Sequence, residues 1–149
     1  MTVNTQVLLK SRPAGKPTID NFEFKDTKIP DIRNGQILTR TIYLSLDPYM
    51  RGRMSEAKSY AEPVPVGGVM IGGAVGIVEK SKNDRFDEGD IVVTHTGWQS
   101  HAICDGRGVR KLSPSLTPIS TALGVLGMPG MTSYVGLKHI GLPVEGETL

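Results

Sequence analysis

The segment spanning residues 43–54 (YLSLDPYMRGRM) holds an acid, two tyrosines and two arginines. Residues 37–46 alternate between apolar and polar side chains, which predicts a strand leading into it. Asp47 can then cap a short helix that Pro48 opens, because proline is tolerated in the first helical turn and an acid accepts its free amide hydrogens. A strand that ends on such a polar turn gathers reactive side chains, so this segment predicts part of a functional site.

Short strands and turns are expected to hold this segment in place. The chain has 18 glycines and 10 prolines among 149 residues, which favours many short strands joined by turns. A chain of this length can bury one core, so a single, mainly β domain is expected. Strands are predicted at residues 6–9, 22–25, 37–46, 67–78, 91–93 and 101–104.

Two further stretches read differently from the strands. Residues 55–65 are polar and end with two prolines, so they predict a loop, which contains Tyr60. The C-terminal part is more helical, with helices expected at residues 121–126 and 132–140. We expect them to be broken at residues 128–130, because proline cannot continue a helix.

Composition and charge exclude several classes of partner. The net charge is +2, and one tryptophan, four tyrosines and three phenylalanines do not interleave with a basic face, so no nucleic-acid partner is expected. No apolar run is long enough for a secretion signal or a membrane span. Cys104 is the only cysteine, so nothing requires an oxidising compartment, and we expect a cytoplasmic protein.

Segment 43–54 and residues 124–134 (GVLGMPGMTSY) together resemble the zinc-free medium-chain dehydrogenase/reductases. Within that superfamily they are most similar to the branch of prostaglandin and alkenal double-bond reductases, which includes the bacterial NADPH-dependent curcumin reductases. The resemblance extends from residues 9–13 to residues 145–149, nearly the whole chain. It implies a mainly β fold with short helices, the chaperonin-10-like (GroES-like) barrel.

The resemblance also implies a domain organisation. Residues 1–149 would form the GroES-like substrate and catalytic domain, ending in an interdomain helix at about residues 131–140. In the family, a sequence like Gly-Glu-Thr-Leu at residues 146–149 leads into the first strand of a Rossmann domain, which is expected after residue 149 and is absent here. We therefore expect NADPH to be bound mainly by that missing domain, the fragment to be inactive alone, and the full-length protein to be a homodimer.

The reaction implied by the resemblance is zinc-free hydride transfer from NADPH to the C=C bond of an α,β-unsaturated ketone or aldehyde, a small-molecule enone. The residues agree with the absence of zinc. One cysteine cannot build a site of four, and His95, His101 and His139 lack the spacing of metal ligands.

The resemblance assigns roles to individual residues. Reduction of an enone leaves an enolate, which a tyrosine hydroxyl can stabilise and help to protonate. Tyr60 takes the position of the family's catalytic tyrosine, although packing of its ring against the prolines is an equal alternative. Four residues are predicted to bind substrate: Tyr49, whose alternative is packing, His95, Thr96, and Trp98, which could equally be a core residue. Three are predicted to contact the cofactor: Met128, Pro129 and Thr132. The alternative for these three is a helix-breaking turn in which methionine fills the core.

Other function classes stay open. The chain has no Gly-x-Gly-x-x-Gly motif and no phosphate-binding loop, so its own motifs do not indicate dinucleotide binding. A stand-alone barrel of this kind can serve as a co-chaperonin or binding module, because a fold does not fix a function. A fragment of a zinc dehydrogenase is the third alternative, which stoichiometric zinc would favour.

Overall fold

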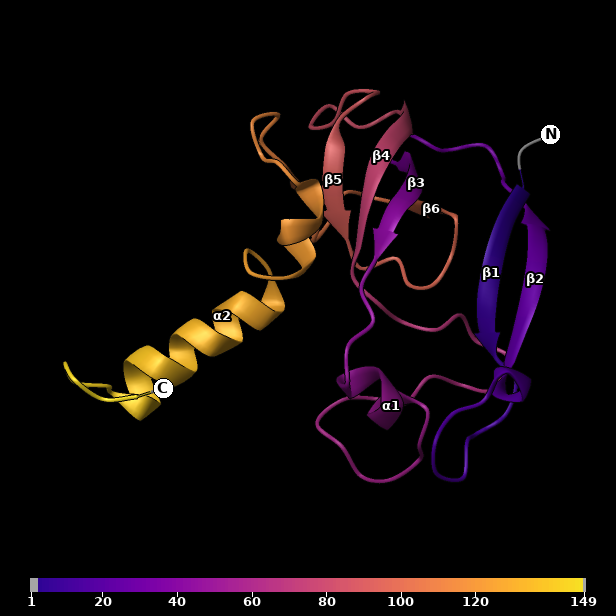
Figure 1. Ribbon diagram of the computed structural model, residues 1–149. Helices are drawn as coiled ribbons and strands as arrows, with labels where there is room; N and C mark the ends of the chain where they lie inside the picture. The colour runs from indigo at the N-terminus through magenta and orange to yellow at the C-terminus, as the bar shows by residue number, and fades with distance from the viewer. Residues whose placement is uncertain (1–2, 149) are drawn as a thin grey trace.

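The computed structural model describes residues 3–148 and is mainly β, as predicted. Its larger sheet has five strands in the order β6-β3-β4-β5-β7, and every pair of neighbours is antiparallel (Figure 1). The strands are β3 (Ile37–Leu44), β4 (Ala74–Ser81), β5 (Ile91–Thr94), β6 (His101–Cys104) and β7 (Arg110–Lys111). A second sheet is the hairpin of β1 (Val3–Leu9) and β2 (Phe22–Lys28), which a short 3-10 turn, η1 (Ile19–Asn21), precedes.

Backbone hydrogen bonds join the hairpin to the larger sheet. The free edge of β1 pairs with two extended segments that lead into β4 and β6. The Val7 amide donates to the Trp98 carbonyl over 2.9 Å, and the Met70 amide donates to the Val7 carbonyl over 3.0 Å. Because both edges of β1 are paired, the hairpin and the sheet enclose a common interior.

The buried apolar side chains form three clusters. One joins the hairpin to α1 (Tyr49–Arg53), and the other two lie against the larger sheet. Met50 and Met54 fasten α1 to the first cluster, so the polar turn before the helix has a fixed place. The first cluster contains Leu9, Met50, Met54, Val64 and Met70. The second contains Ile37, Val78, Phe86 and Val92, and the third contains Val75, Val93, Leu112 and Ala122.

The predicted alternation along residues 37–46 fails in both halves. Ile37, Leu38 and Thr39 are all buried. Ile42 and Leu46, predicted on the same face as Leu38, are 39% and 72% exposed, and the strand ends at Leu44. The pairing of β3 with β4 shifts register between Thr41 and Tyr43. Such a bulge turns the following side chains to the opposite face, which periodicity alone does not reveal.

Two other local predictions are wrong. Asp47 does not cap α1; Pro48 occupies the N-cap position, and the Asp47 carboxylate accepts a hydrogen bond from the Ser45 hydroxyl instead. The strand predicted at residues 67–78 begins only at Ala74, because the residues before it pair with β1 rather than with β3.

The helices near the C-terminus also differ from the prediction. A 3-10 helix, η2 (Ile119–Leu123), is followed by α2 (Met128–Val135) and by a π-helical turn, η3 (Gly136–Gly141). Pro129 lies in the first turn of α2 and does not break it, because the amide that proline lacks has no partner there in any case. Figure 1 shows α2 projecting away from the barrel, and none of its residues is buried.

Within residues 3–148, no helix is both long and apolar enough to cross a membrane. Leu149, the last residue of the predicted domain, lies outside the described residues.

Candidate active site

Strand pairing brings three chain segments to one end of the larger sheet. Leu44 at the end of β3 pairs with Ala74 at the start of β4, and Ala74 pairs with Thr94 at the end of β5. The residues just beyond these pairs therefore lie near one another. They include the polar turn after β3 and His95 after β5.

A cleft of about 390 Å³ opens at this place, and we call it the cleft from here on. Its polar side chains are Ser45, Asp47, Tyr49, His95 and Arg110. Its other lining residues come from the start of β4, from β5, from the segment before β7, from η2 and from the start of α2: Gly73, Val93, Gly108, Ala122, Leu123, Gly127 and Met128. Polar groups thus face an apolar wall, which suits a flat organic ligand with one polar group.

Several polar side chains of the cleft are available for a ligand. The Asp47 carboxylate accepts a hydrogen bond from Ser45. Among residues 3–148, the side chains of Tyr49, His95 and Arg110 form no hydrogen bond and no ion pair. Partial burial raises the pKa of the Tyr49 hydroxyl, and the negative charge of Asp47 adds to this effect. Tyr49 is therefore a protonated hydrogen-bond donor at neutral pH.

Tyr60 lies outside the lining of the cleft. The predicted loop at residues 55–65 is present, and the Tyr60 side chain on it is 87% exposed. One face of its ring lies over the Arg53 guanidinium, whose Cζ is 4.5 Å from the ring centroid. The same Cζ is 5.9 Å from the centroid of Tyr49, so both tyrosine rings lie close to one arginine.

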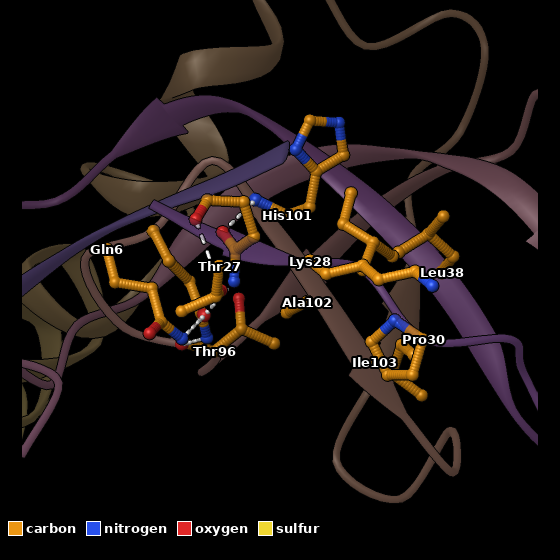
Figure 2. Close-up of a pocket in the computed structure, with 12 residues that line it drawn as sticks. Gln6, Thr27, Lys28, Pro30, Leu38, Thr96, His101, Ala102 and Ile103 are labelled. Atoms are coloured by element: carbon orange, nitrogen blue, oxygen red, sulfur yellow. Dashed lines mark hydrogen bonds between the residues drawn. The ribbon is translucent and has the colours of Figure 1, made fainter. Parts of the chain in front are cut away.

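Thr96 faces a different cavity, of about 450 Å³, which we call the polar cavity (Figure 2). Successive residues of an extended chain point to opposite sides, so His95 and Thr96 separate. Gln6, Thr27, Lys28 and His101 are among the other residues around the polar cavity.

Trp98 packs in the core. Its ring stacks on Phe22 with centroids 5.6 Å apart, and it contacts the cluster that anchors α1. Its buried indole Nε1 has no hydrogen-bond partner within the described residues. This placement explains the ring by packing alone.

The predicted cofactor residues separate in a similar way. Met128 lines the cleft, whereas Pro129 and Thr132 do not. The Thr132 hydroxyl donates a hydrogen bond to the Met128 carbonyl one turn back in α2, over 2.8 Å. Three of the eight predicted site residues, Tyr49, His95 and Met128, therefore meet in one cleft.

Sequence reasoning missed several cleft residues. Arg110 lies on β7, a strand of two residues that is too short to leave a periodic pattern. Ala122 and Leu123 reach the cleft because η2 is a 3-10 helix packed on β4 and β5, a tertiary arrangement with no local signal. Asp47 carried a signal, since a carboxylate beside a tyrosine is a familiar site pattern, but we assigned it to capping.

The described residues contain no cluster of three or more His, Cys, Asp or Glu side chains arranged to hold a metal ion. Cys104 lies on β6, away from the cleft lining, and burial raises the pKa of its thiol. A protonated thiol is a poor metal ligand.

Known proteins resemble this chain over almost its entire length. Residues 5–112 match the family described as the N-terminal domain of oxidoreductase. The chain is 49% identical to the NADPH-dependent curcumin reductase of Escherichia coli K12 over 98% of its length, and 44% identical to rat prostaglandin reductase 1 over 95%. It spans 42% of the length of each of these two relatives.

A solved structure agrees with these relatives. The crystal structure of CurA in complex with NADPH from Vibrio vulnificus superposes with a TM-score of 0.90 at 51% identity, and covers 96% of this chain and 42% of that one. The predicted fold class, a mainly β GroES-like domain with few short helices, is confirmed by this match. The chain belongs to the family of oxidoreductase N-terminal domains, in the branch that contains the NADPH-dependent curcumin reductases and the prostaglandin reductases.

Proposed function

We propose that this chain is the substrate-side domain of an NADPH-dependent reductase that saturates the C=C bond of α,β-unsaturated ketones and aldehydes without zinc. The observation that carries the proposal is the cleft, where Asp47, Tyr49 and His95 face the apolar wall that ends at Met128. A conjugated ketone presents the matching chemistry, namely a flat apolar body with one oxygen at its end.

The apolar wall fits the nicotinamide end of the cofactor. Ala122, Leu123 and Met128 offer a surface for a flat ring, and Gly127 beside them carries no side chain that would hold the ring away. When bound, NADPH supplies the hydride that adds to the β-carbon of the enone. In this arrangement the enone and the nicotinamide ring lie side by side in the cleft.

The tyrosines provide the polar half of the chemistry. Hydride addition moves negative charge onto the carbonyl oxygen, and a neutral hydroxyl can donate a hydrogen bond to that developing enolate. Tyr49 has a raised pKa and no competing partner within residues 3–148, so its proton stays available. We propose Tyr60 as the second donor and as the relay of the proton that the α-carbon finally receives.

The donor set supports a reaction without zinc. The cleft contains one histidine, one carboxylate and no cysteine, whereas catalytic zinc takes three protein ligands. Hydrogen bonds from tyrosine then replace the Lewis acid that would otherwise polarise the carbonyl.

We also propose the domain organisation that the sequence predicts. The chain covers 42% of its relatives, and α2 exposes Met131, Tyr134 and Val135 to solvent. An apolar helix with no buried residue is suited to packing against another domain. We propose that α2 and η3 contact a nucleotide-binding domain, which would hold most of the NADPH. Homodimerisation of the longer protein and a cytoplasmic location remain predictions.

The test uses the longer protein, in which this domain is joined to the part that the relatives carry. We expect it to oxidise NADPH in the presence of a conjugated enone and not in the presence of the matching saturated ketone. With NADPH deuterated at the transferred position, mass spectrometry and NMR should find the label on the β-carbon. Deuterium on the carbonyl carbon, or activity that requires added zinc, would contradict the proposal.

The role of Tyr60 has its own test. Tyr60→Phe removes only the hydroxyl, so we expect kcat for enone reduction to fall about 100-fold while the dissociation constant of NADPH stays the same. Tyr43→Phe is the matched control, because Tyr43 is about half-exposed on β3 and does not line the cleft. An unchanged kcat for Tyr60→Phe would exclude the hydroxyl from the reaction.

A further inference from the structure

Arg53 is a buried cation without a carboxylate partner. Its side chain is only 5% exposed, and no ion pair joins it to any acid among residues 3–148. Burial of a charge is costly unless other groups replace the lost water, so the contacts of this guanidinium indicate what it stabilises.

Those contacts lie in the loop that carries Tyr60. The Arg53 Nη1 donates to the Ala61 carbonyl over 2.6 Å and to the Ser59 hydroxyl over 3.4 Å, so it grips the residues on both sides of Tyr60. The Arg53 carbonyl also accepts the amide hydrogen of Val64 over 2.8 Å. One residue thus holds both the middle and the end of a loop that has no helix or strand of its own.

The guanidinium also contacts both tyrosine rings. Its Cζ lies 4.5 Å from the ring centroid of Tyr60 and 5.9 Å from that of Tyr49. Both distances fall within the range of a cation–π interaction. Apart from this contact, Tyr60 is almost fully exposed, so the arginine supplies the main restraint on where its hydroxyl stands.

We propose that Arg53 is a positioning residue that sets Tyr60 beside Tyr49, so that the two hydroxyls can serve one carbonyl oxygen. The proposal rests on the function proposed for the cleft. Arg53 itself does not reach the cleft lining and has no contact with the reacting atoms in this scheme. Its effect is to keep the exposed tyrosine from sampling orientations in which the hydroxyl points to solvent.

The placement can be tested on this chain without any activity. In protein with labelled tyrosine, the ring signals of Tyr60 should be shifted away from the values of a free tyrosine, with cross-relaxation to the Arg53 side chain. Arg53→Met should bring the Tyr60 signals to the free values while the Trp98 signals stay unchanged. Arg53→Lys, which keeps the charge but loses the planar fork, should restore the shift only in part.

Arg51→Met is the matched control. Arg51 lies on the same helix and also donates to backbone carbonyls, those of Pro13 and Gly15, but within the described residues it makes no cation–π contact with either tyrosine. We expect this variant to leave the Tyr60 signals unchanged. If Arg53→Met leaves them unchanged as well, or if Arg51→Met alters them equally, the proposal is wrong.

The catalytic consequence is measured in the longer protein. Arg53→Met should lower kcat about 10- to 100-fold with little change in KM. The reason is that a misplaced Tyr60 hydroxyl no longer stabilises the enolate that forms in the transition state, whereas substrate binding is little affected. Arg51→Met should retain the wild-type kcat. If the wild-type protein reduces no enone, the proposed function fails, and the NMR experiment still decides whether Arg53 positions Tyr60. If wild type is active and Arg53→Met keeps its kcat, the positioning role is excluded.

Discussion

The cleft and the polar cavity have similar volumes, about 390 and 450 Å³, yet their polar groups are used differently. In the polar cavity, side chains bind one another. The Gln99 side-chain oxygen accepts hydrogen bonds from Asn4 and Gln6, and the Asn4 side-chain oxygen Oδ1 in turn accepts the backbone amide hydrogen of His101. In the cleft, Tyr49 and Arg110 have no such partner within the described residues.

The surroundings of His101 complete this contrast. Its Nδ1 is hydrogen-bonded to the Ser100 hydroxyl over 3.0 Å. Its Nε2 lies 3.5 Å from a Glu79 oxygen and has no hydrogen-bond partner within the described residues. Figure 2 shows the imidazole ring turned away from the other labelled residues. This histidine therefore belongs to the packing around the cavity.

The difference indicates a structural polar network in the polar cavity and a candidate ligand site in the cleft. A network whose members satisfy one another stabilises the fold and leaves little for a ligand to gain. Polar side chains that face an opening without partners can exchange water for a ligand at small cost. Cavity size would not have distinguished the two regions, whereas the hydrogen bonds do.

The largest expected effect is on activity, because the chain of 149 residues is expected to contain a complete fold but only part of the active site. Hydrogen bonds among its own lining side chains hold the polar cavity together, but the cleft ends at α2, which has no buried residue. We predict that the purified chain of 149 residues shows no NADPH-dependent enone reduction, while it still unfolds cooperatively. A spectrophotometric assay checks the first statement and denaturant unfolding the second. Measurable turnover would show that the cleft is complete without another domain.

The next effect is on stability, in the polar cavity. Asn4→Ala removes the acceptor of the buried His101 amide and one donor to Gln99. Because a buried amide would lose its partner, we expect the free energy of unfolding to fall by about 2–3 kcal/mol. Urea titration measures it. A loss below about 0.5 kcal/mol would mean that the network is not structural.

A smaller effect depends on pH and concerns Tyr49 in the cleft. Its pKa is higher in the folded chain than the ordinary value because burial and then Asp47 disfavour the phenolate. The folded state holds this proton more tightly, so stability is full below the unfolded pKa of about 10 and falls as pH rises through the folded pKa.

Two variants check this pH dependence. Tyr49→Phe should remove the Tyr49 part of the alkaline decrease in unfolding free energy. Asp47→Asn should lower the pKa of Tyr49, measured by NMR titration, because the carboxylate charge is one of its causes. A Tyr49 pKa that stays the same in Asp47→Asn would show that the two groups do not interact.

The smallest expected effect is on stability and concerns Arg110 in the cleft. Arg110→Ala removes an exposed side chain with no ion pair within the described residues, so we expect the unfolding free energy to change by less than about 0.5 kcal/mol. Lys111→Ala is the comparison variant, because Lys111 lies on the same strand and its removal breaks an ion pair with Asp90. A large loss for Arg110→Ala would mean that the cleft carries hidden structural contacts.

Local pattern was sufficient for the parts of the fold that depend on it. Strands β1, β5 and β6 lie where the sequence predicted strands, at residues 6–9, 91–93 and 101–104, and the loop around Tyr60 follows from the placement of proline. The exposed half of β3 did not follow, because a bulge is decided by the pairing with β4. The start of α2 was missed because Pro129 was interpreted as a break, although proline is tolerated in the first helical turn.

The site was predictable to a similar extent. The residue types of the turn after β3 indicated part of a site before the structure was known. Of the predicted site residues, Tyr49, His95 and Met128 line the cleft. Arg110 and Leu123 could not be found, because their side chains reach the cleft only through the packing of β7 and η2 on the sheet. The sequence indicated Arg53 only as one of two arginines in segment 43–54, because its contacts with Ser59 and Ala61 form across a loop.

The central claim is that an enone binds in the cleft and not in the polar cavity. The most direct test is a crystal structure of the longer protein with NADP⁺ and an unreactive enone analogue. We predict that the analogue's carbonyl oxygen accepts a hydrogen bond from the hydroxyl of Tyr49 or Tyr60, with the nicotinamide against Met128. An analogue bound in the polar cavity, or one whose oxygen contacts neither tyrosine, would contradict the account.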